Sequence, residues 1–135
     1  MIEERAKRLL DFRALKGAME GKDPEAMLAF YAEDAELRVE NAALPEGRVF
    51  ELRGRSQIER YLRAICEQEM ECLLLEGGAV YGQRSIAFVG SCRYADGGAL
   101  RVETMLEVEG GLIARQIDSV RRAASEDAMA AGGER

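Results

Sequence analysis

Acid–base chemistry in this 135-residue chain must come from side chains other than imidazole, because the sequence contains no histidine. That absence excludes Ser-His-Asp and Cys-His catalysis, His-ligated zinc and proton transfer by imidazole. The best remaining candidate is Asp118, which alternates with Gln116 and Val120 along one face of a predicted strand. Inside an apolar core, desolvation would raise the pKa of its carboxyl group, which suits a general acid or base. Hydrophobicity alone does not decide whether this face points inward, since Ile113 and Ile117 occupy the opposite face.

Two further polar groups could assist Asp118. Tyr61 lies on the apolar stripe of a predicted helix, so its phenol, or the Gln116 amide, could donate a hydrogen bond to a developing oxyanion. The simpler interpretation is a core tyrosine with a satisfied hydroxyl, beside a strand carboxylate that is only hydrogen-bonded. The predicted pocket for a small apolar ligand is mostly aliphatic, and its lining consists of Leu37, Val39, Leu100, Val102, Thr104 and Val120.

Three helices are predicted in the first half of the chain. Apolar residues at helical spacing indicate a helix over residues 2–19 that ends near Gly21. Asp23 is placed to cap a second helix, with Pro24 in its first turn, that ends around residues 32–34. Ser56 and Glu59 form a capping box for a third helix, whose inward stripe is Ile58, Tyr61, Leu62 and Ile65.

Alternating segments predict strands over residues 35–41, 49–52, 70–76, 79–94, 99–109 and 112–121. Glycine-containing turns at residues 96–98 and 109–111 indicate consecutive antiparallel hairpins. Helices gathered against a strongly bent sheet make an α+β domain, in which a cone-shaped, curved antiparallel sheet wraps around the three N-terminal-side helices. The domain is expected to span residues 1–122, with a flexible tail over residues 123–135.

Three motifs occur in this order: Lys22-Asp23-Pro24-Glu25-Ala26 leading into Phe30-Tyr31-Ala32-Glu33-Asp34-Ala35, then Gly54-Arg55-Ser56-Gln57-Ile58, then Glu109-Gly110-Gly111-Leu112-Ile113. Together they resemble the nuclear transport factor 2-like superfamily, and within it the SnoaL-like and ketosteroid-isomerase-like branch. The resemblance covers roughly residues 5–121. It implies that Gln116 and Asp118 face the lumen of the cone and that two copies pair through their sheets.

The known catalytic sets of that superfamily are not matched. By the resemblance, the base, tyrosine and second acid of ketosteroid isomerases fall on Val39, on Leu15 and on Leu100 or Arg101. Limonene-epoxide-hydrolase-like proteins use a set of five catalytic residues. By the resemblance, only the final aspartate of that set has a counterpart here, Asp118. The other four positions fall on or near Leu37, Val39, Val89 and Ser91. Two hypotheses remain. One is a cofactor-free and metal-free isomerase, cyclase or dehydratase in which Asp118 moves the proton. The other is a non-catalytic module for ligand binding or dimerisation.

Charge and cysteine content set expectations about partners and compartment. A net charge of −6 argues against nucleic acid, and no apolar run is long enough for a membrane span. Cys66, Cys72 and Cys92 have no metal or redox spacing, so reduced thiols and a cytoplasmic location are expected. The outward row formed by Arg101, Glu103, Met105 and Glu107 carries both charge signs, and it could pair with itself across the two-fold axis of a homodimer.

Overall fold

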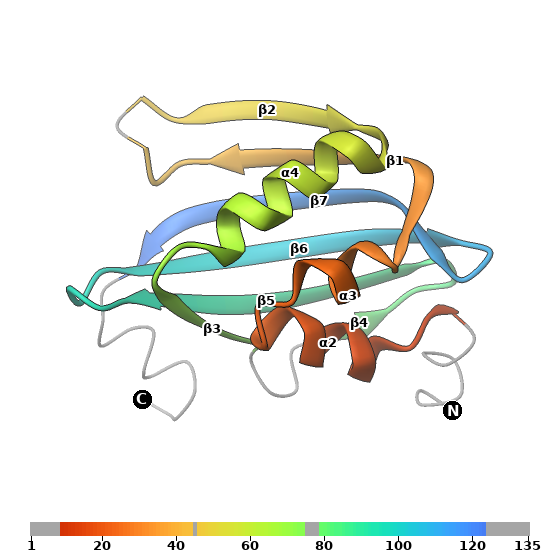
Figure 1. Cartoon of the computed structure of the whole chain (residues 1–135), viewed down its shortest axis with the longest axis horizontal. Coiled ribbons are helices and arrows are strands. Elements are labelled where there is room, and N and C mark those ends of the chain that lie inside the picture. Colours follow the sequence, from red (N-terminus) through yellow and green to blue (C-terminus); the bar gives the residue numbers. More distant parts are fainter. Residues whose placement is uncertain (1–8, 45, 75–78, 124–135) are drawn as a thin grey trace.

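The computed structural model describes residues 9–44, 46–74 and 79–123. Its elements follow the chain as α2 (Phe12–Glu20), α3 (Pro24–Leu28), β1 (Tyr31–Asn41), β2 (Arg48–Arg53), α4 (Gly54–Cys66), β3 (Met70–Leu74), β4 (Val80–Tyr81), β5 (Ser85–Tyr94), β6 (Ala99–Glu109) and β7 (Leu112–Ala123). The three helices lie over one face of a single sheet (Figure 1). No helix in the described ranges has the length and apolar character needed to cross a membrane.

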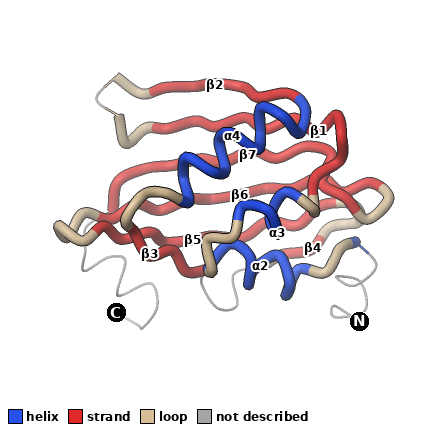
Figure 2. The backbone as a smooth tube through the Cα atoms, in the orientation of Figure 1, coloured by secondary structure: helices blue, strands red, loops and turns tan. Residues whose placement is uncertain are grey.

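The sheet is open, with its strands in the order β2-β1-β7-β6-β5-β3, and β4 pairs with β5 beside this path. Neighbouring strands are antiparallel, except that β1 and β7 pair in parallel. Figure 2 shows the strands as one curved layer behind the helices. The predicted α+β cone is therefore confirmed, and its sheet is mixed because the last strand inserts between β1 and β6.

The core lies between the helices and the covered face of the sheet. Leu37, Ile58, Ile86, Leu106 and Ile113 are completely buried there. Burying such a side chain stabilises the fold by about 1.5–3 kcal/mol. On β6 the buried positions recur at every second residue from Thr104 to Val108, as expected for a strand with one covered face. The helices supply apolar stripes of helical period, and these stripes close the core.

The first predicted helix is wrong in its extent. Residues 10 and 11 are not helical, and α2 begins at Phe12 after an N-cap in which the Asp11 carboxylate accepts a hydrogen bond from the Ala14 N–H at 3.1 Å. Residues 2–8 of that prediction lie outside the described residues. The second helix is capped by Asp23 as predicted, with a 3.1 Å hydrogen bond from the Ala26 N–H. It ends at Leu28, however, and leaves Tyr31 to begin β1.

The predicted Ser56–Glu59 capping box does not form. Helix α4 begins earlier, at Gly54, whose φ of +84° is a left-handed conformation that glycine adopts without strain. The side chain of Gln57 accepts a 2.8 Å hydrogen bond from the Arg53 N–H, so Gln57 satisfies the backbone at this end instead. The position of α4 still places Ile58 and Leu62 in the core, as predicted.

The strand predicted over residues 79–94 is divided in two. A turn, closed by a 2.8 Å hydrogen bond from the Gly82 N–H to the Ser85 carbonyl, separates β4 from β5 and folds them into a hairpin. Residues 82–85 read Gly-Gln-Arg-Ser, a polar run typical of a turn, and the prediction of one continuous strand did not take it into account. Of the predicted tail, residues 124–135 lie outside the described residues.

Two of the three cysteines form a disulfide, so the prediction of reduced thiols is wrong for Cys72 and Cys92. They are directly opposed on β3 and β5, with their Cα atoms 4.0 Å apart. Cys66 on α4 is free and partly buried. The expectation of a reducing compartment rested on unpaired cysteines and loses that basis.

Candidate functional site

A cavity of about 280 Å³ lies between the helices and the inner face of the sheet. Apolar side chains supply most of its wall. They include Met19 of α2, Met27 of α3, Leu62 and Ile65 of α4, and Phe88 of β5. A few polar groups converge among them. This composition is typical of small-molecule sites, although the volume is just below the usual range for drug-sized ligands.

Asp118 of β7 provides the carboxylate in the wall of this cavity, and its side chain is only 8% exposed. Strand register places it directly opposite Thr104 of β6, so both side chains point to the same face. Its Oδ1 atom accepts two hydrogen bonds, from Thr104 Oγ1 at 2.8 Å and from Gln116 Nε2 at 3.0 Å. Within the described part of the chain no group donates to Oδ2. One carboxylate oxygen is thus held in place, while the other is available to a ligand.

Gln116 is itself held by a residue that the sequence did not single out. The Tyr31 hydroxyl, at the start of β1, donates a 2.5 Å hydrogen bond to Gln116 Oε1. That bond fixes the amide so that its N–H group faces Asp118. The sequence placed Tyr31 near the end of a helix. It gave no signal for this contact, which joins residues 85 positions apart.

Burial controls the titration of the carboxyl group. Desolvation raises the pKa of Asp118 above its ordinary value, and the hydrogen bonds from Gln116 and Thr104 offset part of that rise. The pKa values of the Tyr31 and Tyr61 phenols are also raised, first by burial and then by the nearby Asp118 charge. Both phenols therefore stay protonated and act as hydrogen-bond donors at neutral pH.

Tyr61 reaches the cavity from α4. Its ring packs edge-on against Phe50 of β2, with the ring centroids 5.7 Å apart. Among the described residues its hydroxyl has no hydrogen-bond partner, whereas the Tyr31 hydroxyl is already engaged. Tyr61 is therefore the phenol that is free to donate to a ligand.

The structure brings most of the predicted site residues together. The cavity wall contains Asp118, Gln116, Tyr61, Leu100, Val102, Thr104 and Val120. It does not contain Leu37 and Val39, which are each only 1% exposed and belong to the closed core. Helix α4 packs over β1 and covers this part of the sheet (Figure 1).

Other chemistry finds little support in the site. No group of three or more His, Cys, Asp or Glu side chains lies together as metal ligands anywhere in the described ranges. Among the cavity-lining residues Asp118 is the only one with a carboxylate. What the arrangement can do is hold one ligand and exchange one proton with it.

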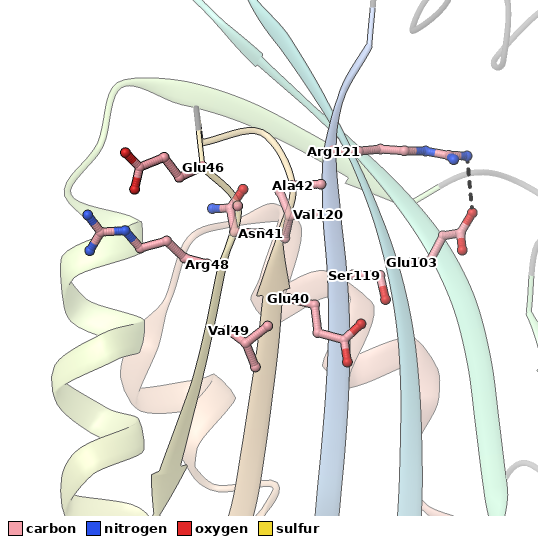
Figure 3. Close-up of a pocket in the computed structure, with 11 residues that line it drawn as sticks. Glu40, Asn41, Ala42, Glu46, Arg48, Val49, Glu103, Ser119, Val120 and Arg121 are labelled. Atoms are coloured by element: carbon pink, nitrogen blue, oxygen red, sulfur yellow. Dashed lines mark hydrogen bonds and ion pairs between the residues drawn. The ribbon is translucent and has the colours of Figure 1, made fainter.

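A second hollow, of about 430 Å³, opens on the outer surface around the ends of β1 and β7 (Figure 3). Its rim is charged and includes Glu40, Arg48 and Arg121, and the Arg121 guanidinium reaches Glu103 at 3.4 Å. Exposed ion pairs of this kind are screened by water and contribute little energy. Without a buried polar group this hollow lacks the features of a chemical site, although it is larger than the inner cavity.

Several solved structures share the architecture of this chain. A candidate ketosteroid isomerase from Kribbella flavida matches with a TM-score of 0.66 and 24% identity, over 89% of this chain and 80% of its own. A nuclear transport factor 2-like protein of unknown function from Mesorhizobium loti matches with a TM-score of 0.69 and 20% identity, over 87% and 92% of the two chains. The chain has the nuclear transport factor 2-like fold.

A candidate polyketide cyclase from Xanthomonas campestris shares this fold, with a TM-score of 0.61 and 21% identity over 86% of this chain and 90% of its own. The sequence matches no family model and no curated protein. At these identities the nuclear transport factor 2-like fold is what the structures have in common. A fold hosts many activities, so the function must be argued from the residues of the cavity.

Proposed function

We propose that the protein is a cofactor-free enzyme that moves a proton next to a carbonyl group, as an isomerase, cyclase or dehydratase of small, mostly apolar molecules. The observation that supports this most is the geometry of Asp118, whose Oδ1 is held by two donors while Oδ2 remains available in the cavity. A carboxylate fixed in this way is ready to accept a proton without reorganisation. Its raised pKa brings its basicity closer to neutral pH.

The proposed reaction begins when Oδ2 of Asp118 removes a proton from the carbon next to the carbonyl. The electrons of the broken C–H bond move into the carbonyl, which becomes an enolate, and the carboxylate becomes a carboxylic acid. The Tyr61 hydroxyl donates a hydrogen bond to the enolate oxygen. In a ketone with a β,γ double bond, return of the proton from Asp118 to the γ-carbon gives the conjugated isomer. In a β-hydroxy ketone, the enolate electrons form the new double bond as the β C–O bond breaks, and the hydroxide leaves as water with the proton from Asp118.

In this proposal Gln116 has a different role from the one predicted by the sequence. Its amide N–H donates to Asp118 and its carbonyl accepts from Tyr31, so both ends of the side chain are engaged. We therefore propose Gln116 as a positioning residue for the carboxylate. Tyr61, whose hydroxyl has no partner among the described residues, takes the oxyanion role alone.

Exchange of α-protons for deuterons in a panel of small ketones tests the proposal with probes that need not be the natural substrate. Wild-type protein in D₂O should accelerate exchange of at least one ketone, and Asp118→Asn should abolish the acceleration while the fold persists. Glu109→Gln, which changes an exposed carboxylate at the end of β6, is the matched control and should behave as wild type. Undiminished exchange in Asp118→Asn, or no exchange with any ketone, would favour the non-catalytic binding module.

A further inference from the structure

The ionised form of Asp118 has no counter-charge in the cavity wall. Among the described residues that line the cavity, Asp118 is the only aspartate or glutamate, and none is a lysine or arginine. Lys22 donates from its ammonium group to the main-chain carbonyls of Gln68 and Met70, but it is not among the residues that line the cavity. A buried carboxylate without a counter-charge is costly, because its charged form loses hydration that the hydrogen bonds from Thr104 and Gln116 replace only in part.

Each class of ligand would change this balance differently. An anion would place a second negative charge beside Asp118 in a medium of low dielectric constant, which both groups resist. A neutral molecule could donate a hydrogen bond to Oδ2 but would leave the charge uncompensated. A cation would supply the missing counter-charge, and an ammonium group also has the N–H donors that the unused oxygen Oδ2 accepts.

The rest of the wall also suits an organic cation. Of the eight Phe and Tyr residues in the sequence, five line this one cavity: Tyr31, Phe50, Tyr61, Phe88 and Tyr94. Aromatic faces attract cations through their quadrupole. The net charge of −6 over the whole chain raises the local concentration of cations further.

We propose that the inner cavity is a binding site for small organic ammonium ions, in which Asp118 is the counter-ion and the aromatic residues enclose the apolar body of the ligand. The volume of about 280 Å³ limits the ligand to a molecule smaller than a typical drug, such as an amine with one ring. The ammonium donates to Asp118 Oδ2, and Thr104 and Gln116 continue to hold Oδ1.

Binding of the cation depends on pH in a defined direction. Burial favours the protonated form of Asp118 in the free protein, and the ammonium favours the ionised form. Affinity for an amine should therefore rise with pH through the titration of Asp118, as long as the amine stays protonated. The titratable groups facing Asp118 are Tyr31 from β1 and Tyr61 from α4, and both keep their protons at neutral pH. Its partners on β6 and β7, Thr104 and Gln116, do not titrate.

Three ligands of nearly equal shape but different charge test the proposal: benzylamine, benzyl alcohol and benzoate. Calorimetric titration of the wild-type protein at pH 7.5 should give an affinity for benzylamine at least about tenfold higher than for benzyl alcohol, with benzoate the weakest. Asp118→Asn should remove the preference for the amine, because the asparagine has no charge. Glu109→Gln is again the matched control and should keep it.

The proposal is overturned if benzyl alcohol binds as tightly as benzylamine, if benzoate matches either, if the amine preference survives in Asp118→Asn, or if none of the three binds. Should Asp118→Asn fail to fold, benzylamine affinity of the wild type between pH 5 and 8 replaces it, and a flat profile would count against the counter-ion. These titrations measure equilibrium binding of molecules that do not react. Either this proposal or the enzymatic one can therefore fail alone.

Discussion

Reduction of the Cys72–Cys92 disulfide should lower the free energy of unfolding by an amount that depends on the length of the loop it closes. The bond joins residues 20 positions apart and so closes a loop of about that length in the unfolded chain. The chain-entropy relation for such a loop gives about 3 kcal/mol at 25 °C. For a domain of 135 residues this corresponds to a decrease in Tm of roughly 10 °C.

Thermal and urea unfolding with and without a thiol reductant measure this difference directly. The double variant Cys72→Ala/Cys92→Ala should show a similar loss and no further response to reductant. Cys66→Ala is the control, since Cys66 is free and its variant should retain the full response. A loss below about 1 kcal/mol in the reduced wild type would refute the reasoning, because the loop would then be constrained equally without the bond.

The disulfide also bears on the site. Strand β3 lies at an edge of the sheet and pairs only with β5, and the disulfide adds a covalent cross-link between these two strands. Cys72 and Cys92 both line the inner cavity, together with Leu73 and Leu74 of the same strand. Reduced protein should therefore bind benzylamine more weakly than oxidised protein, even where both are fully folded.

Three more predictions follow from the hydrogen bonds and the outer surface. Tyr31→Phe leaves the buried Gln116 carbonyl without its donor and should cost about 1–3 kcal/mol of unfolding free energy. It should also move the pH profile of activity or amine binding to higher pH, whereas Tyr81→Phe, outside the cavity, should do neither. Burial raises the pKa of Asp118 in the folded state, so the folded protein holds this proton more tightly than the unfolded chain does. The free energy of unfolding of the wild type, relative to that of Asp118→Asn, should therefore fall as pH rises from about 4 through the raised pKa. A difference in unfolding free energy that stays constant from pH 4 to 8 would contradict this. Finally, we propose a homodimer through the outer sheet face, which light scattering should detect and which Met105→Glu, at a 39% exposed position on β6, should dissociate; a monomeric wild type would rule it out.

Much of the fold could be read from local patterns. Alternation along residues 99–109 and 112–121 predicted β6 and β7 with bounds close to those observed, because a strand with one covered face repeats every second residue. The Asp23 cap was equally local, since a helix N-terminus needs a side-chain acceptor within three residues. The prediction was wrong between β4 and β5, where it included the polar residues 82–85 in one continuous strand although they form a turn.

The sequence by itself determined the kinds of element and most of their bounds, and it named Asp118 as a candidate without deciding whether its face of the strand points inward. Only the tertiary structure decided which side chains surround Asp118. Register between β6 and β7 placed Thr104 opposite it, and the parallel pairing of β1 with β7 brought Tyr31 to Gln116. Packing of α4 over β1 closed the core around Leu37 and Val39 and left them out of the cavity. These contacts join residues far apart in the chain, and their energy depends on register and packing, which periodicity along the sequence does not encode.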